Sequence, residues 1–164
     1  MTATQTIPNG TSIAPDMFRQ KIIANAIDSE NEAFAFYTGA ATVARDLATK
    51  TLFESFASDE LRYRDFLECC MMADQRAMQV ERLNDYKVTD MLMTPQLSPE
   101  MKPLDGVVLA IKRKRETMMM YITLASESRD AGQKELFMNL SVIAQSHKSR
   151  LEDIYTNMAF PEVW

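Results

Sequence analysis

Four ionisable residues lie at the centres of apolar helical repeats in this chain: Glu30, Glu60, Lys114 and His147. Around each of them, the positions three, four and seven residues away are mostly apolar, which is typical of a helix face that packs into a core. A lone charge in a core is very costly, so these groups must meet one another, a metal ion or both. Two carboxylates and one imidazole are a familiar ligand set for a single zinc or iron ion.

The chain repeats itself at an offset of 84 residues. Residues 26–67, set without a gap above residues 110–151, give eleven identities in 42 positions, where chance would give about two or three. The first copy contributes Ala26, Ile27, Glu32, Tyr37, Ala41, Arg45, Asp46, Lys50, Leu52, Phe53 and Leu67. This register aligns Glu30 with Lys114, Glu60 with Ala144, and Tyr63 with His147. The sequence therefore predicts a duplicated helical hairpin.

Helix start and stop signals divide the chain into four long helices. Pro15 suits the first turn of the first helix, Asp46 is a good N-cap for the second, and Asp130 with Gln133 reads as a capping box for the fourth. The expected helices are 15–44, 46–82, 104–127 and 130–157. The segment 84–103 contains three prolines and is the one long connection. We expect a disordered arm over 1–14, the bundle over 15–157, and a C-terminal tail over 158–164.

The pattern of these elements indicates the fold class. No segment shows sustained alternation of apolar and polar residues, so no sheet is expected. Two helical hairpins joined by a long crossover predict an all-α, ferritin-like four-helix bundle.

Composition limits the possible partners and location. A formal net charge of −5 argues against nucleic-acid binding, which favours a basic surface. No run of apolar residues is long enough to span a membrane. The N-terminus has neither the basic start nor the apolar stretch of a signal peptide, so we expect a cytoplasmic protein. We also expect a homodimer.

The helices and their spacing resemble the rubrerythrin branch of the ferritin-like superfamily. In that family a di-iron site takes one Glu from each of the first and third helices and a Glu-x-x-His from each of the second and fourth. The resemblance implies that three ligand positions are kept, as Glu30, Glu60 and His147. It implies that three are replaced, as Tyr63, Lys114 and Ala144, and that Thr117 stands where the family has a further carboxylate. Tyr37 and Tyr121 correspond to tyrosines that pack beside the metals in the family.

These replacements leave two interpretations of the site open. An ammonium within hydrogen-bonding reach stabilises carboxylates and repels a cation, so Lys114 can replace a metal within a Glu30–Lys114–Glu60 cluster. Alternatively, Lys114 extends away and one divalent ion, iron or zinc, binds Glu30, Glu60 and His147; a di-iron site is not expected. The first functional hypothesis is a divergent rubrerythrin-like protein with weak or no oxidoreductase or peroxidase activity. The second is a non-catalytic scaffold for partner binding or assembly, which a Lys114 ammonium among the carboxylates would favour.

Overall fold

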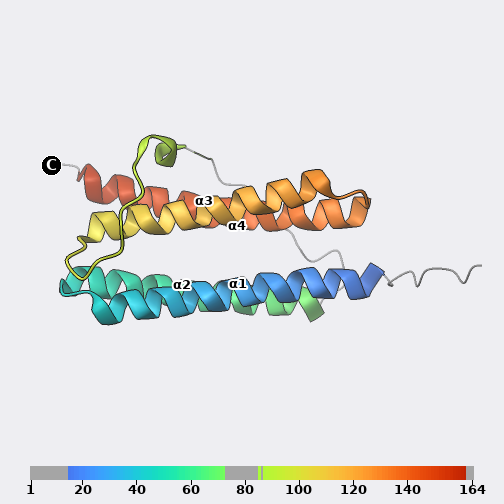
Figure 1. The fold of residues 1–164 in the computed structure, drawn as a ribbon, viewed down its shortest axis with the longest axis horizontal. Coiled ribbons are helices and arrows are strands. Elements are labelled where there is room, and N and C mark those ends of the chain that lie inside the picture. The colour runs from blue at the N-terminus through green and yellow to red at the C-terminus, as the bar shows by residue number, and fades with distance from the viewer. Residues whose placement is uncertain (1–14, 73–84, 86, 162–164) are drawn as a thin grey trace, which may run out of the picture.

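The chain forms a bundle of four long helices, antiparallel within each hairpin, as shown by a computed structural model that describes residues 15–72, 85 and 87–161 (Figure 1). The elements are α1 (Pro15–Val43), α2 (Leu47–Met72), the short 3-10 helix η2 (Val88–Met91), α3 (Pro103–Glu127) and α4 (Ala131–Ala159). The described residues contain no strand. The predicted all-α four-helix bundle, two hairpins joined by a long crossover, is confirmed.

Seven of the eight expected helix boundaries can be compared with the structure, and each lies within two residues of the observed one. Helix α1 begins at Pro15, as predicted, and α3 begins at Pro103. Helix α4 continues to Ala159, so the expected tail begins inside the helix. The disordered arm expected over 1–14, the second helix beyond Met72, and the end of the tail lie outside the described residues.

Both predicted N-caps have the expected geometry. The Asp46 carboxylate accepts a hydrogen bond from the Thr49 backbone amide at 2.8 Å, and the Asp130 carboxylate accepts one from the Gln133 amide at 2.9 Å. Each bond satisfies an amide that would otherwise lack a partner in the first helical turn. The two caps occupy equivalent positions in the sequence repeat, and they start the second helix of each hairpin.

The two hairpins form two layers, with their turns at opposite ends of the bundle (Figure 1). Contacts within each hairpin are extensive, and contacts between hairpins are fewer. The end of the crossover packs on the α1–α2 turn, where Thr49 donates its hydroxyl to the Met101 carbonyl at 3.0 Å and the Arg45 amide donates to the Pro99 carbonyl at 2.9 Å. These bonds attach the end of the crossover to the first hairpin.

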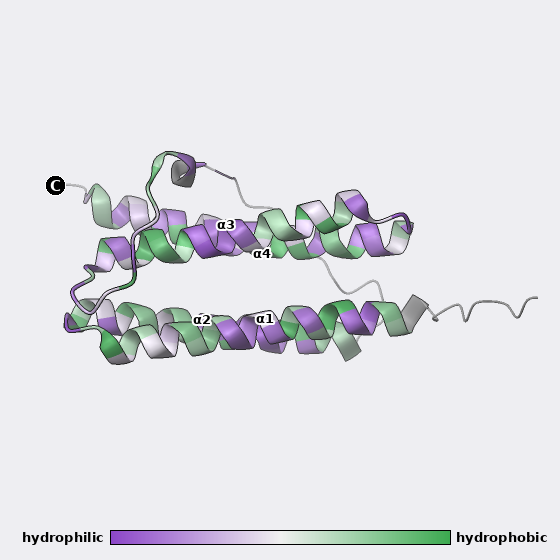
Figure 2. Cartoon of the chain, viewed as in Figure 1, coloured by the Kyte–Doolittle hydropathy of each residue, from purple (hydrophilic) through white to green (hydrophobic). Residues whose placement is uncertain are grey.

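Two apolar clusters fill the interior. One includes Phe53, Phe56 and Ile111, and the other includes Ile23 and Leu140. Hydrophobic and hydrophilic residues are interleaved along all four helices (Figure 2). The four ionisable residues singled out in the sequence stand, along each helix, between the positions that supply these clusters. They therefore form a polar layer between two apolar ones. Among the helices described, none combines the length and the apolar character needed to cross a membrane.

Candidate functional site

The centre of the bundle holds an ion cluster of one lysine and two glutamates. The Lys114 ammonium donates to Glu60 Oε2 at 2.6 Å and to Glu30 Oε2 at 3.0 Å. All three side chains are buried, with exposures of 5% for Lys114, 7% for Glu30 and 3% for Glu60. Their helices, α3, α1 and α2, come from both hairpins. The cluster is thus a charged link across the interface where the hairpins otherwise make few contacts.

His147 completes the polar layer from α4, and its ring stacks on Tyr63. The ring centroids lie 3.1 Å apart with an interplanar angle of 16°. His147 is 6% exposed, and its Nδ1 has no hydrogen-bond partner among the described residues. Burial, and then the positive charges of Lys114 and Arg150, hold the pKa of His147 well below its usual range. The imidazole is therefore neutral and does not add a second cation to the layer.

The cluster contains one more carboxylate than ammonium groups, and the protonation equilibria reflect this imbalance. Burial raises the pKa of Glu60 to about 8, with a contribution from its hydrogen bond with Glu30, although Lys114 acts in the opposite direction. Burial lowers the pKa of Lys114, but the charges of Glu30 and Glu60 outweigh that effect and raise it overall. The lysine therefore stays charged, and Glu60 is the group that takes up a proton.

The remaining predicted positions surround this cluster. Ala144 is buried and fills the place of a carboxylate with a methyl group. Tyr37 is buried beside Phe56, with ring centroids 5.5 Å apart, and burial and then Glu60 raise its pKa. Burial, and then Glu30, raise the pKa of Tyr121 to about 12. Thr117 donates its hydroxyl to the Arg113 carbonyl in its own helix, at 3.2 Å.

A cavity of about 310 Å³ lies beside the cluster. Glu60, Lys114 and His147 contribute to its lining, together with residues that the sequence did not identify as part of a site. These additional residues are Phe56, Asp59, Arg150, Leu151, Asp153 and Ile154. The helical patterns place some of them on inward faces, but a cavity depends on the spacing between hairpins, which no local pattern encodes.

The residues present do not fit a di-iron centre. Among the described residues, no group of three or more His, Cys, Asp or Glu side chains is placed to hold a metal ion. Lys114 sits between the two remaining carboxylates, and Ala144 supplies no ligand. The assignment of Glu30, Glu60 and His147 as ligands of a single ion stays a prediction. It would require Lys114 to leave both carboxylates.

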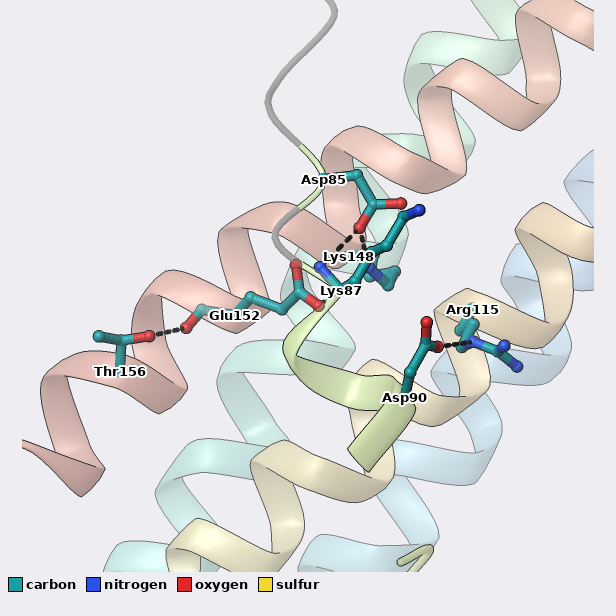
Figure 3. Close-up of polar contacts among 7 residues, drawn as sticks. All are labelled: Asp85, Lys87, Asp90, Arg115, Lys148, Glu152 and Thr156. Atoms are coloured by element: carbon teal, nitrogen blue, oxygen red, sulfur yellow. Dashed lines mark hydrogen bonds and ion pairs between the residues drawn. The ribbon is translucent and has the colours of Figure 1, made fainter. Parts of the chain in front are cut away.

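A second buried ion cluster was missed in the sequence. Lys148 Nζ lies 2.5 Å from Asp85 Oδ1 and 2.9 Å from Glu152 Oε1, so it connects α4 to the crossover (Figure 3). Arg115 of α3 pairs with Asp90 of η2 at 2.9 Å. Nothing local distinguishes Lys148 from an exposed lysine, because its burial comes from the crossover segment that lies over α4. These pairs fasten the crossover to the second hairpin.

One protein family matches the sequence of this chain over most of its length. No curated protein matches the sequence. A hypothetical protein from Pyrococcus furiosus has a solved structure that aligns over 93% of this chain and 97% of its own, with 19% identity and a TM-score of 0.47. The family model for rubrerythrin matches residues 21–155, which include α2, α3, most of α1 and α4, and every residue of the polar layer. This ferritin-like four-helix bundle therefore belongs to the rubrerythrin family.

Proposed function

We propose that this chain is a rubrerythrin-family scaffold in which the Lys114 ammonium takes the electrostatic place of metal ions, and that it does not carry out a two-iron oxidation cycle. The observation that carries this proposal is the pair of contacts from Lys114 Nζ, at 2.6 Å to Glu60 and 3.0 Å to Glu30. The bundle then serves in partner binding or assembly, with weak or no oxidoreductase activity of its own.

Electrostatics supports this role for Lys114. Two carboxylates that face each other in a core repel unless a cation lies between them, and either a metal ion or an ammonium can supply that charge. An ammonium covalently attached to α3 is present at all metal concentrations. A divalent ion would have to displace it from two short, charge-assisted hydrogen bonds, which are among the stronger polar interactions in proteins. Lys114 therefore competes with any metal for the same two ligands.

A single divalent ion is the second candidate function of the site. It is favoured by the buried Nδ1 of His147, which has no hydrogen-bond partner in the described part of the chain. Buried polar atoms normally have a partner, so an unsatisfied imidazole nitrogen in the same polar layer as two carboxylates suits a metal ligand. Binding would use Glu30, Glu60 and His147 and would require the Lys114 side chain to swing away.

Metal analysis of protein produced in iron-supplemented medium and purified without a His tag separates these candidates. The proposal expects substoichiometric metal and no absorption from an oxo-bridged di-iron centre. Hydrogen peroxide turnover should equal that of Glu60→Ala. Two irons per chain, or a clear loss of turnover in Glu60→Ala, would overturn the proposal. One tightly bound ion that is lost in His147→Ala would establish the second candidate instead.

Restoring the missing ligands tests whether the backbone still aims these positions at one point. The triple variant Tyr63→His, Lys114→Glu and Ala144→Glu rebuilds the full family ligand set. The metal-free variant should be destabilised, because four carboxylates then crowd one core. Ferrous iron should bind at about two ions per chain and recover the lost stability, since metal binding is coupled to folding. A folded triple variant that binds no more iron than the natural chain would show that the helix register is wrong.

A further inference from the structure

The cavity beside the Lys114 cluster has an acidic floor. Glu60 and Lys114 line it directly, and Glu30, which does not line it, accepts a hydrogen bond from Lys114. Two carboxylates therefore share one ammonium. At the rim, Arg150 and Asp153 carry opposite charges, and Asp59 pairs with Arg62 at 3.1 Å. The rim is thus close to balanced, and the floor has two carboxyl groups for one ammonium group.

The walls of the cavity are aromatic and aliphatic. Tyr37, Phe56 and Tyr63 contribute rings, and Leu151 and Ile154 contribute alkyl groups from α4. Lys114 Nζ already lies 5.5 Å from the centroid of the Tyr63 ring, so this part of the cavity accommodates a cation over an aromatic face. A volume of about 310 Å³ is at the lower end of the range for small-molecule sites.

We propose that this cavity binds a small organic amine, whose ammonium group donates to Glu60 at the floor and whose apolar body packs on Phe56, Leu151 and Ile154. The proposal rests on the proposed function, because it requires Lys114 rather than metal ions to occupy the centre of the bundle. The amine supplies Glu60 with a second charged hydrogen-bond donor, because Lys114 is shared with Glu30. The aromatic walls favour the same sign of charge.

Other ligand classes fit the cavity less well. A carboxylate would bring a third negative group against the Glu30–Lys114–Glu60 cluster, and Lys114 is already shared by two acids. A neutral alcohol of the same shape could use the apolar walls but would leave the charge of the floor uncompensated. A hydrated metal ion would gain nothing from Leu151 and Ile154. The amine alone uses both the floor and the walls.

Three ring compounds of similar size test this selectivity: cyclohexylamine, cyclohexanol and cyclohexanecarboxylate. Binding to the full chain is measured by calorimetry in mildly alkaline buffer, and the metal content of the same sample is determined. The amine should bind at least about tenfold more tightly than the alcohol, which is the scale of a hydrogen bond to a charged group. The carboxylate should bind least. Equal affinities, or tightest binding of the carboxylate, would overturn the proposal.

Two variants locate the site. Glu60→Gln keeps the shape of the floor and leaves Lys114 paired with Glu30, so it should fold and lose the preference for the amine over the alcohol. Glu68→Gln removes an exposed α2 carboxylate that does not line the cavity, and it should bind as the natural chain does. Ile154→Trp, which fills the cavity, should abolish binding of both compounds. Unchanged amine binding in Glu60→Gln or Ile154→Trp would place the ligand elsewhere and refute the proposal.

The same measurements separate the two proposals. A metal-free protein that does not bind the amine contradicts only the amine site. A protein loaded with two irons contradicts the proposed function, whatever its affinity for the amine.

Discussion

The two hairpins share one sequence register but carry different charges at the aligned core positions. The first hairpin keeps both acidic positions, Glu30 and Glu60, whereas the second has Lys114 and Ala144 at the aligned positions. Residues 84 positions apart then meet in the structure: Glu30 pairs with Lys114, and Tyr63 stacks on His147. The comparison shows that a lysine at one position of the second hairpin forms a buried ion pair with the glutamate at the aligned position of the first.

A second pair of aligned positions shows how strongly the surroundings matter. Arg64 and Glu68 on α2 form an ion pair at 3.7 Å, with side chains 31% and 48% exposed. Lys148 and Glu152, at the same positions of α4, form a pair at 2.9 Å with side chains 2% and 1% exposed. The spacing is the same in both helices. The α4 pair differs in that the crossover residue Asp85 also contacts Lys148.

Removing the Lys114 ammonium should lower the stability of the bundle more than removing the α4 ion pair or an N-cap. Lys114→Met leaves Glu30 and Glu60 facing each other without a positive charge, and breaking a buried cluster in this way costs about 3–5 kcal/mol of unfolding free energy. Because the carboxyls can compensate only by taking up protons, the loss relative to the natural chain should grow as the pH rises. Chemical denaturation at acidic and alkaline pH measures both effects.

The control for this substitution is Lys134→Met, which removes an exposed lysine of α4 and should change stability little. Zinc or manganese should restore part of the stability of Lys114→Met by binding the freed carboxylates. A Lys114→Met protein as stable as the natural chain at alkaline pH, without metal, would show that Lys114 does not hold the cluster together.

The covered and uncovered ion pairs provide a matched test. Lys148→Met removes the ammonium that contacts both Glu152 and Asp85. It should lower the free energy of unfolding by on the order of 3 kcal/mol. Arg64→Met, at the aligned position of α2, should leave the denaturation midpoint nearly unchanged, because an exposed pair contributes little. Equal losses in the two variants would contradict the view that the crossover gives the α4 pair its energetic weight.

The buried Glu60 carboxyl of the first hairpin should also make the free energy of unfolding depend on pH. The pKa of Glu60 is raised from 4.5 to about 8, so the folded chain holds a proton that the unfolded chain has released between these values. Stability should therefore fall as the pH rises from about 4.5 to about 8, by up to roughly 1.4 kcal/mol per pH unit.

Replacing Glu60 with glutamine isolates this contribution. The difference in unfolding free energy between the natural chain and Glu60→Gln should vary with pH in that window and level off above it. Glu68→Gln serves as the control and should follow the pH profile of the natural chain. A parallel profile for Glu60→Gln would mean that Glu60 does not take up the proton.

The smallest effects should come from the two N-caps. Asp130→Ala removes one capping bond and should cost about 1 kcal/mol. Asp46→Ala should cost more, because the hydroxyl of the buried Thr49, which has one proton to share between Asp46 at 2.9 Å and the Met101 carbonyl at 3.0 Å, also loses one of its two acceptors. Thermal unfolding measures the stability lost by each variant. A larger loss for Asp130→Ala than for Asp46→Ala would show that the Thr49 contact does not strengthen the Asp46 cap.

Much of the fold could be predicted because its signals are local. The starts at Pro15, Asp46 and Asp130 depend on backbone amides within one turn of the capping residue, and the apolar spacing around Glu30 or His147 depends only on helical periodicity. These patterns correctly placed four ionisable residues at core depth. The repeat register also named the positions that meet across the bundle.

The sequence by itself thus determined the helices, their inward faces and the substitution of Lys114 for an acid. It left open whether Lys114 enters the cluster or extends away, because a long flexible side chain can reach either environment from the same backbone position. Only the tertiary structure decided that question, together with the burial of Lys148 and the cavity beside Glu60. Each of these depends on how far apart the hairpins lie and where the crossover runs, and no spacing within a single helix encodes either quantity.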